Sequence, residues 1–79
     1  SSGLLVYPNP VHSELSIQAP VQLSLHPRIL ILDLNGRVLL RKKLTAAYSK
    51  VNVSGLAAGI YLLKYEDDQH HLAVRFVKK

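Results

Sequence analysis

The sequence has 79 residues, of which 48% are hydrophobic and 19% are charged. A chain of this length forms one domain and buries only about 60% of the surface that its unfolded form exposes. The composition is too apolar for a disordered chain. The absence of cysteine excludes disulfides and cysteine-containing zinc sites, so packing and strand pairing must stabilise the fold. The longest apolar runs have four residues, against about 18 needed to span a bilayer, so no transmembrane segment is expected.

Ten Lys and Arg residues against five acids give a net charge of +5. Such a balance suits nucleic acid or an acidic surface. The positive residues are scattered along the sequence, with no interleaved aromatic residues and no helix to enter a groove. This placement favours a solvated basic surface over nucleic-acid binding.

Residues 1–4 read Ser-Ser-Gly-Leu and lack the charged and apolar regions of a secretion leader. We interpret them as the end of a linker or a remnant of cloning and assign the domain to residues 5–79. The chain is expected to be one domain of a longer protein.

The apolar pattern along the chain is that of strands. No segment has the spacing of an amphipathic helix, whereas alternation and short β-branched runs recur between turn residues. Strand signals cover residues 4–7, 14–18, 21–25, 28–34, 37–44, 50–53, 60–66 and 72–78. Their spacing predicts an all-β fold, a small immunoglobulin-like sandwich of about seven strands in two antiparallel sheets. Within 14–18, alternation places Leu15 and Ile17 on the buried face and the polar residues on a solvated face.

The central hairpin has the strongest local pattern, because Asn35-Gly36 lies between two apolar runs and both residues tolerate the positive φ of a type I′ turn. A two-residue turn places Leu34 opposite Arg37. It further predicts the pairs Leu32–Leu39, Leu30–Arg41, Ile31–Leu40 and Ile29–Lys42. Both faces of the hairpin are then partly apolar, so either both are covered or one is exposed for a partner.

Tyr7-Pro8-Asn9-Pro10 ends the first strand, because the prolines fix φ and remove donors while Asn9, preceding a proline, is extended. We interpret this segment as a rigid strand exit, with a polyproline-type recognition surface as the alternative.

The corner before residues 60–66 combines a glycine with a tyrosine. Gly59 is expected to supply a positive φ or a close backbone approach. Alternation points Tyr61 to the same side as Leu63 and Tyr65. We interpret Tyr61 as structural, with its hydroxyl donating to nearby backbone.

No pattern of catalytic or ligand residues stands out. His70 and His71 point to opposite faces of a strand and do not easily share a metal; with the polar residues 66–69 they are interpreted as the solvated end of a hairpin. Residues 66–68 lack the ligand spacing of a calcium loop. Neither a Gly-x-Ser-x-Gly elbow nor a glycine-rich phosphate loop is present. We expect no enzyme activity, no metal and no cofactor.

Five short motifs follow one another along the chain. They are 7–10 (YPNP), 14–17 (ELSI), 31–38 (ILDLNGRV), 56–64 (LAAGIYLLK) and 74–79 (VRFVKK). Each is weak alone, but in this order the chain resembles the type A C-terminal sorting domain of type IX secretion cargo, also called Por secretion. The resemblance covers residues 5–79. One departure is Ala57, where the family commonly has proline.

The resemblance implies an immunoglobulin-like domain of a larger precursor in a Bacteroidetes-type bacterium. The precursor would pass through the periplasm, and the domain would direct it across the outer membrane through the type IX translocon and shuttle components. A sortase-like peptidase at the cell surface commonly removes the domain and attaches the cargo to anionic lipopolysaccharide. Some carriers retain it.

Residues carried over from the family motifs are the candidate recognition residues. They are Pro8, Asn9, Pro10, Asp33, Gly36, Arg37, Gly59, Tyr61, Arg75, Phe76, Val77, Lys78 and Lys79. The last five are expected to form much of the sorting signal. Phe76 is predicted to be buried and Arg75 and Val77 to point away, with Lys78 and Lys79 extending past the last pairing partner.

Two other functions are compatible with a small sandwich. One is a non-catalytic carbohydrate- or protein-binding module, which an exposed row of Tyr or Trp on one sheet would favour. The absence of Trp and the positions of Tyr61 and Tyr65 within a strand count against carbohydrate. The other is a structural spacer. Unpaired strand edges also allow a weak homodimer.

Overall fold

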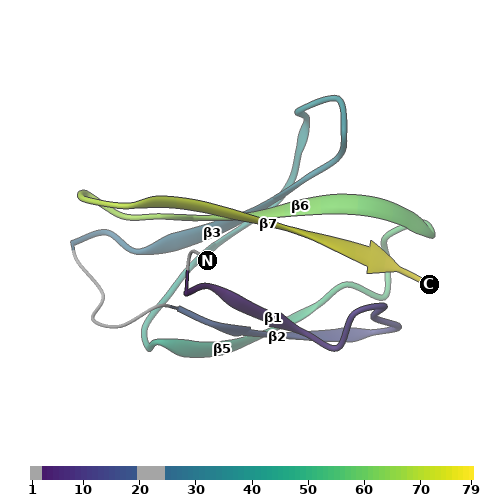
Figure 1. The fold of residues 1–79 in the computed structure, drawn as a ribbon, viewed down its shortest axis with the longest axis horizontal. Helices are drawn as coiled ribbons and strands as arrows, with labels where there is room; N and C mark the ends of the chain where they lie inside the picture. The colour runs from purple at the N-terminus through teal and green to yellow at the C-terminus, as the bar shows by residue number, and fades with distance from the viewer. Residues whose placement is uncertain (1–2, 20–24) are drawn as a thin grey trace.

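The computed structural model describes residues 3–19 and 25–79, which form two antiparallel sheets packed as two layers (Figure 1). The strands are β1 (Leu5–Tyr7), β2 (Glu14–Gln18), β3 (Arg28–Leu32), β4 (Val38–Lys43), β5 (Tyr48–Asn52), β6 (Gly59–Glu66) and β7 (His71–Lys78). One sheet has the order β1-β2-β5 and the other β4-β3-β6-β7. The predicted all-β sandwich of about seven strands is confirmed. No helix in the described ranges could cross a membrane.

The strand expected at 21–25 falls largely on residues 20–24, which lie outside the described residues. Leu25 itself lies in a bend rather than a strand. The predicted strands flanking the central turn were too long, since β3 ends at Leu32 and β4 begins at Val38.

The core lies between the two sheets and is built from alternate strand positions. In β6 every second residue is buried, and Tyr61, Leu63 and Tyr65 all belong to the core cluster, as predicted. Phe76 of β7 is fully buried in the same cluster. Leu4, one residue before β1, is also buried in the core. Alternation is therefore a reliable guide to the faces of the larger sheet.

The polar face expected for residues 14–18 is only partly solvated. Leu15 and Ile17 are buried as predicted, but Ser16 between them is buried as well. Tyr48 on the neighbouring strand covers it, with the tyrosine hydroxyl 3.4 Å from the Ser16 hydroxyl. β2 is the central strand of its sheet, so long side chains on the flanking strands reach over the short serine.

The register predicted for the central hairpin is correct away from the turn and wrong next to it. The pairs Leu30–Arg41, Ile31–Leu40 and Ile29–Lys42 are present. Leu32, however, pairs with Val38 instead of Leu39, and the register shifts between Ile31 and Leu32. The loop is therefore longer than the predicted two-residue turn.

Asp33 explains the difference. Its carboxylate accepts hydrogen bonds from the backbone N–H groups of Asn35 (2.9 Å) and Arg37 (3.0 Å), and its carbonyl accepts one from the N–H of Gly36 (3.1 Å). The turn consequently begins at Asp33, and only Gly36 is left-handed, with φ +87°. A turn followed by one left-handed residue is the usual form of a three-residue hairpin loop, so the type I′ prediction is wrong.

Candidate functional site

The candidate recognition residues near the two ends of the chain meet at one junction. The amide oxygen of Asn9 accepts a hydrogen bond from the backbone N–H of Val77 at 2.9 Å, although the residues are 68 positions apart. Val11 then pairs with Lys78 in a parallel bridge, donating to the carbonyl of Val77 and accepting from the N–H of Lys79, both at 2.8 Å. We call residues 8–11 together with 77–79 the terminal junction.

The terminal junction holds the last residues of the chain, which were expected to extend freely. Lys78 was expected to extend past its last partner, but it lies inside β7, opposite Gly59, and is only 7% exposed. Its Nζ donates to the carbonyl oxygen of Lys79 at 2.7 Å. The backbone N–H of Lys79 is bonded to Val11. The prediction of a free basic tail is therefore wrong, because Val11 supplies a further backbone partner beside β7.

Beneath the junction, β6 and β7 hold each other through an aromatic pair. Tyr61 lies opposite Phe76, and their rings stack with centroids 5.7 Å apart. The Tyr61 hydroxyl donates to the carbonyl of Ala57 at 2.6 Å, which confirms the predicted structural role. Of the two alternatives expected for Gly59, the positive φ is present, at +158°, whereas the open space where a Cβ would lie shows no close backbone approach.

Exposed side chains give the junction a surface that a partner could contact. Pro8, Asn9 and Pro10 are exposed, and Val77 and Lys79 are exposed on the adjoining strand. Arg75 is exposed two residues earlier, on the same side of β7 as Val77. Phe76 and Lys78, the alternating residues, are buried, as expected for Phe76 but not for Lys78.

Asp33, Gly36 and Arg37 are not part of the junction. Leu32 lies opposite Leu62, which lies opposite Arg75, so the turn projects from the same end of the sheet as the junction but two strands away. The hydrogen bond from the Arg37 N–H lowers the pKa of Asp33, and the Asn35 N–H and Arg37 guanidinium act in the same direction against a raising effect of desolvation. Asp33 also forms an ion pair with Arg37 at 3.3 Å.

One buried polar cluster, centred on Asp67, was not predicted from the sequence. Asp67, in the β6–β7 turn that was expected to be solvated, is only 3% exposed. Its carboxylate accepts hydrogen bonds from the Tyr65 hydroxyl and from the backbone N–H groups of Gln69 (2.8 Å) and His70 (2.6 Å). The available clue was an Asp at the start of a polar turn, where its side chain can cap backbone donors. These three donors make the Asp67 carboxylate the cap of the turn.

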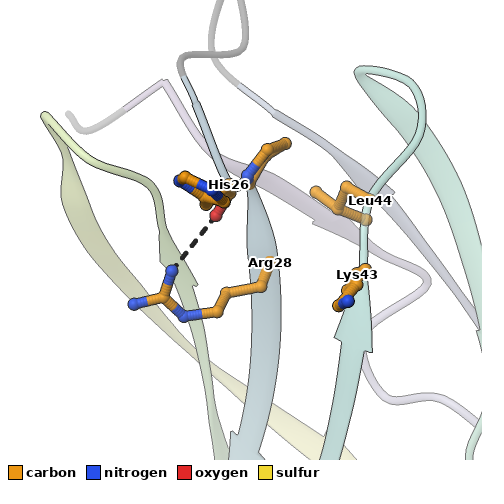
Figure 2. Close-up of a pocket in the computed structure, with 5 residues that line it drawn as sticks. His26, Arg28, Lys43 and Leu44 are labelled. Atoms are coloured by element: carbon orange, nitrogen blue, oxygen red, sulfur yellow. Dashed lines mark hydrogen bonds between the residues drawn. The ribbon is translucent and has the colours of Figure 1, made fainter.

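A pocket of about 380 Å³ lies at the end of the larger sheet that is opposite the terminal junction. It is lined by His26, Pro27, Arg28, Lys43 and Leu44 (Figure 2). The Arg28 guanidinium is already bonded to the carbonyl of His26 at 3.1 Å and paired with Glu66 at 3.2 Å. Among the described residues no group of three or more His, Asp or Glu side chains could hold a metal ion. The pocket therefore offers a basic rim without a ligand set for a metal.

Comparisons with known proteins agree with this architecture. A solved structure of PorZ, a bacterial surface component of the type-IX secretion system of Porphyromonas gingivalis, matches with a TM-score of 0.72 and 23% identity. The match covers 98% of this chain but 11% of that one, so the chain spans about a ninth of that protein. No curated protein matches the chain.

The low sequence identity to the solved structure supports only a shared fold, whereas a family model identifies the family. The model describes the secretion system C-terminal sorting domain, and it matches residues 5–79. It represents a sorting signal rather than a family known for catalysis. Because nearly the whole chain is matched, this chain belongs to the family of secretion system C-terminal sorting domains, those of type IX secretion.

Proposed function

We propose that this domain directs a larger protein from the periplasm across the outer membrane, and that the terminal junction is the surface read by the type IX translocon or its shuttle components. The hydrogen bond between Asn9 and Val77 carries this proposal, because it joins the first and last family motifs into one exposed surface. A surface built from both ends of the domain exists only when the domain is folded. The proposed sorting signal is thus a surface of the folded domain rather than a free tail.

A reporter fusion tests the sorting role. Residues 5–79 would be fused behind a periplasmic reporter in a host with a type IX system, and protease accessibility on intact cells would measure surface delivery. We expect delivery of the wild-type fusion. Retention in the periplasm of a fusion whose domain is folded would overturn the sorting function, whereas a binding module or a spacer predicts that retention.

The role of the junction is tested with a pair of matched variants. The junction variant Val77→Ala/Lys79→Ala removes exposed atoms of the junction and leaves its backbone bonds in place. The control Leu25→Ala/Lys50→Ala likewise truncates one apolar side chain and one lysine at exposed positions elsewhere. We expect the junction variant to remain in the periplasm although its melting temperature stays within a few degrees of the wild type, and the control to reach the surface. Equal delivery of both would show that the junction is not read.

Removal of the domain after transit is the next step of the proposal. A sortase-like peptidase would cut before the domain and attach the cargo to anionic lipopolysaccharide, so the surface reporter would lose about the 8.8 kDa of this chain. The mass of the reporter recovered from the cell surface measures this loss. A surface reporter that keeps the domain would identify the protein as one that retains it.

A carbohydrate-binding module is the second candidate, because two exposed tyrosines lie on the outer face of the smaller sheet. Tyr7 is 43% exposed and Tyr48 is 48% exposed, and both lie beside the β2 residues that point outward. Exposed aromatic rings next to polar groups are suited to sugar rings. Affinity electrophoresis in soluble polysaccharides, with Tyr7→Ala/Tyr48→Ala as the comparison, tests this candidate; equal mobility of both proteins in every gel rejects it.

A further inference from the structure

Positive charge that is scattered in the sequence gathers on one face of the fold. The outward positions of the larger sheet hold five Lys or Arg residues and one acid, a net charge of +4 out of +5 for the chain. The remaining five Lys or Arg and four acids leave +1. We call this surface the basic face; its cations are Arg28, Arg41, Lys43, Lys64 and Arg75.

The strand register places these cations in neighbouring rows. Arg28 lies between Lys43 of β4 and Glu66 of β6, and Leu30 lies between Arg41 and Lys64. Ile29 and Ile31, which alternate with them on β3, point into the core, so the basic residues point outward.

Most of this charge has no compensation within the domain. Glu66, the single acid of the face, is shared by Arg28 at 3.2 Å and Lys64 at 3.7 Å. Arg41, Lys43 and Arg75 make no ion pair with any residue that the structure describes. An uncompensated cluster of like charges raises the local potential and attracts an acidic partner.

One end of the basic face is apolar. Ile60 and Val77 lie opposite each other on β6 and β7 and are 43% and 36% exposed. The partly exposed Leu62 continues this apolar end toward β3, where it lies opposite the buried Leu32. Docking there would bury apolar side chains while the cations meet acidic groups, a combination typical of protein interfaces.

The absence of aromatic side chains on the basic face favours an acidic protein as the partner over nucleic acid or a membrane. None of the outward positions of β3, β4, β6 and β7 in the described residues holds Phe, Tyr or Trp. Bases of single-stranded nucleic acid stack on such rings, and membrane interfaces favour Trp and Tyr. Cations on edge strands also discourage aggregation, which would explain those of β4 and β7 but not Arg28 and Lys64 on the central strands.

We propose that the basic face docks an acidic protein surface that also offers apolar side chains. This inference rests on the proposed function, because the docking takes place during export of the fused cargo. The face begins beside the terminal junction, since Val77 belongs to both surfaces. A partner could therefore contact the junction and the basic face together.

Charge removal on the basic face, compared with equal charge removal away from it, tests the proposal. The basic-face variant is Arg41→Gln/Lys43→Gln, whose two cations have no ion pair in the described residues. The control Lys42→Gln/Lys50→Gln loses the same charge; Lys42 points to the other side and bonds the Lys50 carbonyl at 2.8 Å. With the reporter fusion, we expect surface delivery of the basic-face variant to fall roughly tenfold. The control should be delivered like the wild type, and both variants should keep the melting temperature within a few degrees.

Each outcome has one meaning. Equal delivery of the basic-face variant and the wild type would overturn the docking proposal and leave the sorting function standing. Failure of the wild-type fusion would overturn the sorting function and, with it, the docking proposal. A vesicle arm covers the lipid alternative: cosedimentation of the purified domain with phosphatidylglycerol vesicles, lost only in the basic-face variant, would replace the protein partner with a membrane. We expect no cosedimentation.

Discussion

The terminal junction and the β3–β4 turn project from the same end of the larger sheet, and both contain family-motif residues, yet they are stabilised in different ways. The turn closes on itself, since all the bonds of the Asp33 side chain reach residues two to four positions away. The junction depends on one bond that links residues 68 positions apart and on a bridge from Val11 to Lys78. A local turn survives changes elsewhere, whereas a long-range junction reports whether the whole domain is folded.

The largest expected effect comes from removing the side chain that seats β7 in the core. Phe76 is fully buried and stacks on Tyr61, so Phe76→Ala should lower the free energy of unfolding by about 3–5 kcal/mol. That is a large part of the stability of a small domain. The neighbouring change Val77→Ala, at a half-exposed position, is the control and should cost less than about 1 kcal/mol. Similar urea midpoints for the two variants would contradict the burial of β7.

The second-largest effect on stability is expected at the β3–β4 turn, where it arises from backbone strain alone. Gly36 has φ +87° and open space where a Cβ would lie, so Gly36→Ala forces a left-handed alanine without a clash, at a cost of about 1–2 kcal/mol. Gly55 also has open space but no left-handed φ, which makes Gly55→Ala the matched control with an expected change within about 0.5 kcal/mol. Gly36→Val should be worse than Gly36→Ala because of its branched Cβ. Thermal melts that rank Gly36→Ala level with Gly55→Ala would refute the strained turn.

The bond that closes the junction has a smaller expected effect on stability. Asn9→Ala removes the acceptor of the Val77 N–H and should cost about 1 kcal/mol. Asn9→Asp keeps an acceptor oxygen at the same position and should recover most of the loss. Hydrogen exchange of the Val77 amide is the direct measurement, since it should speed up in Asn9→Ala and remain slow in Asn9→Asp. Slow exchange in both variants would show that another group protects the amide.

Patterns within one strand or one turn predicted the fold well. Alternation placed Tyr61 and Phe76 in the core, and the motifs around Gly36 and Gly59 placed the turns. The type I′ prediction failed because the Asn35-Gly36 pair was read without the carboxylate two positions earlier. Asp33 captures two backbone donors, and this begins the turn sooner.

The contacts of the candidate site were predictable only in part. Nothing in the local pattern of Pro8-Asn9-Pro10 indicates that its central side chain bonds to Val77, because strand order across the two sheets decides which edges meet. For the same reason Lys78 was expected at a free end although it lies in a paired strand. The basic face is a similar case. Cations spaced irregularly along four strands share a face only once the register is known.

The smallest expected effect concerns the charge of Asp33, and it separates the backbone of the turn from its side chains. The pKa of this carboxyl is lowered from a usual value near 3.8, with the Arg37 N–H as the largest cause. A lowered folded pKa adds stability that is present above the unfolded pKa and is lost as the pH falls through the folded pKa. At neutral pH, Asp33→Asn should therefore be slightly less stable than the wild type, and the difference should disappear well below pH 3.8.

Arg37→Gln tests which part of Arg37 lowers the pKa. This variant keeps the backbone N–H that donates to Asp33 at 3.0 Å and removes the exposed guanidinium, which lies 3.3 Å from the other carboxylate oxygen. An exposed ion pair of this kind contributes little, because solvent screens it. A titration of the Asp33 carboxyl carbon by NMR should hence show a pKa in Arg37→Gln that is still clearly lowered and close to that of the wild type. A return of the pKa to its usual value would mean that the guanidinium, rather than the backbone of the turn, stabilises the charged carboxylate, and the turn would then depend on a side-chain pair that solvent and salt can weaken.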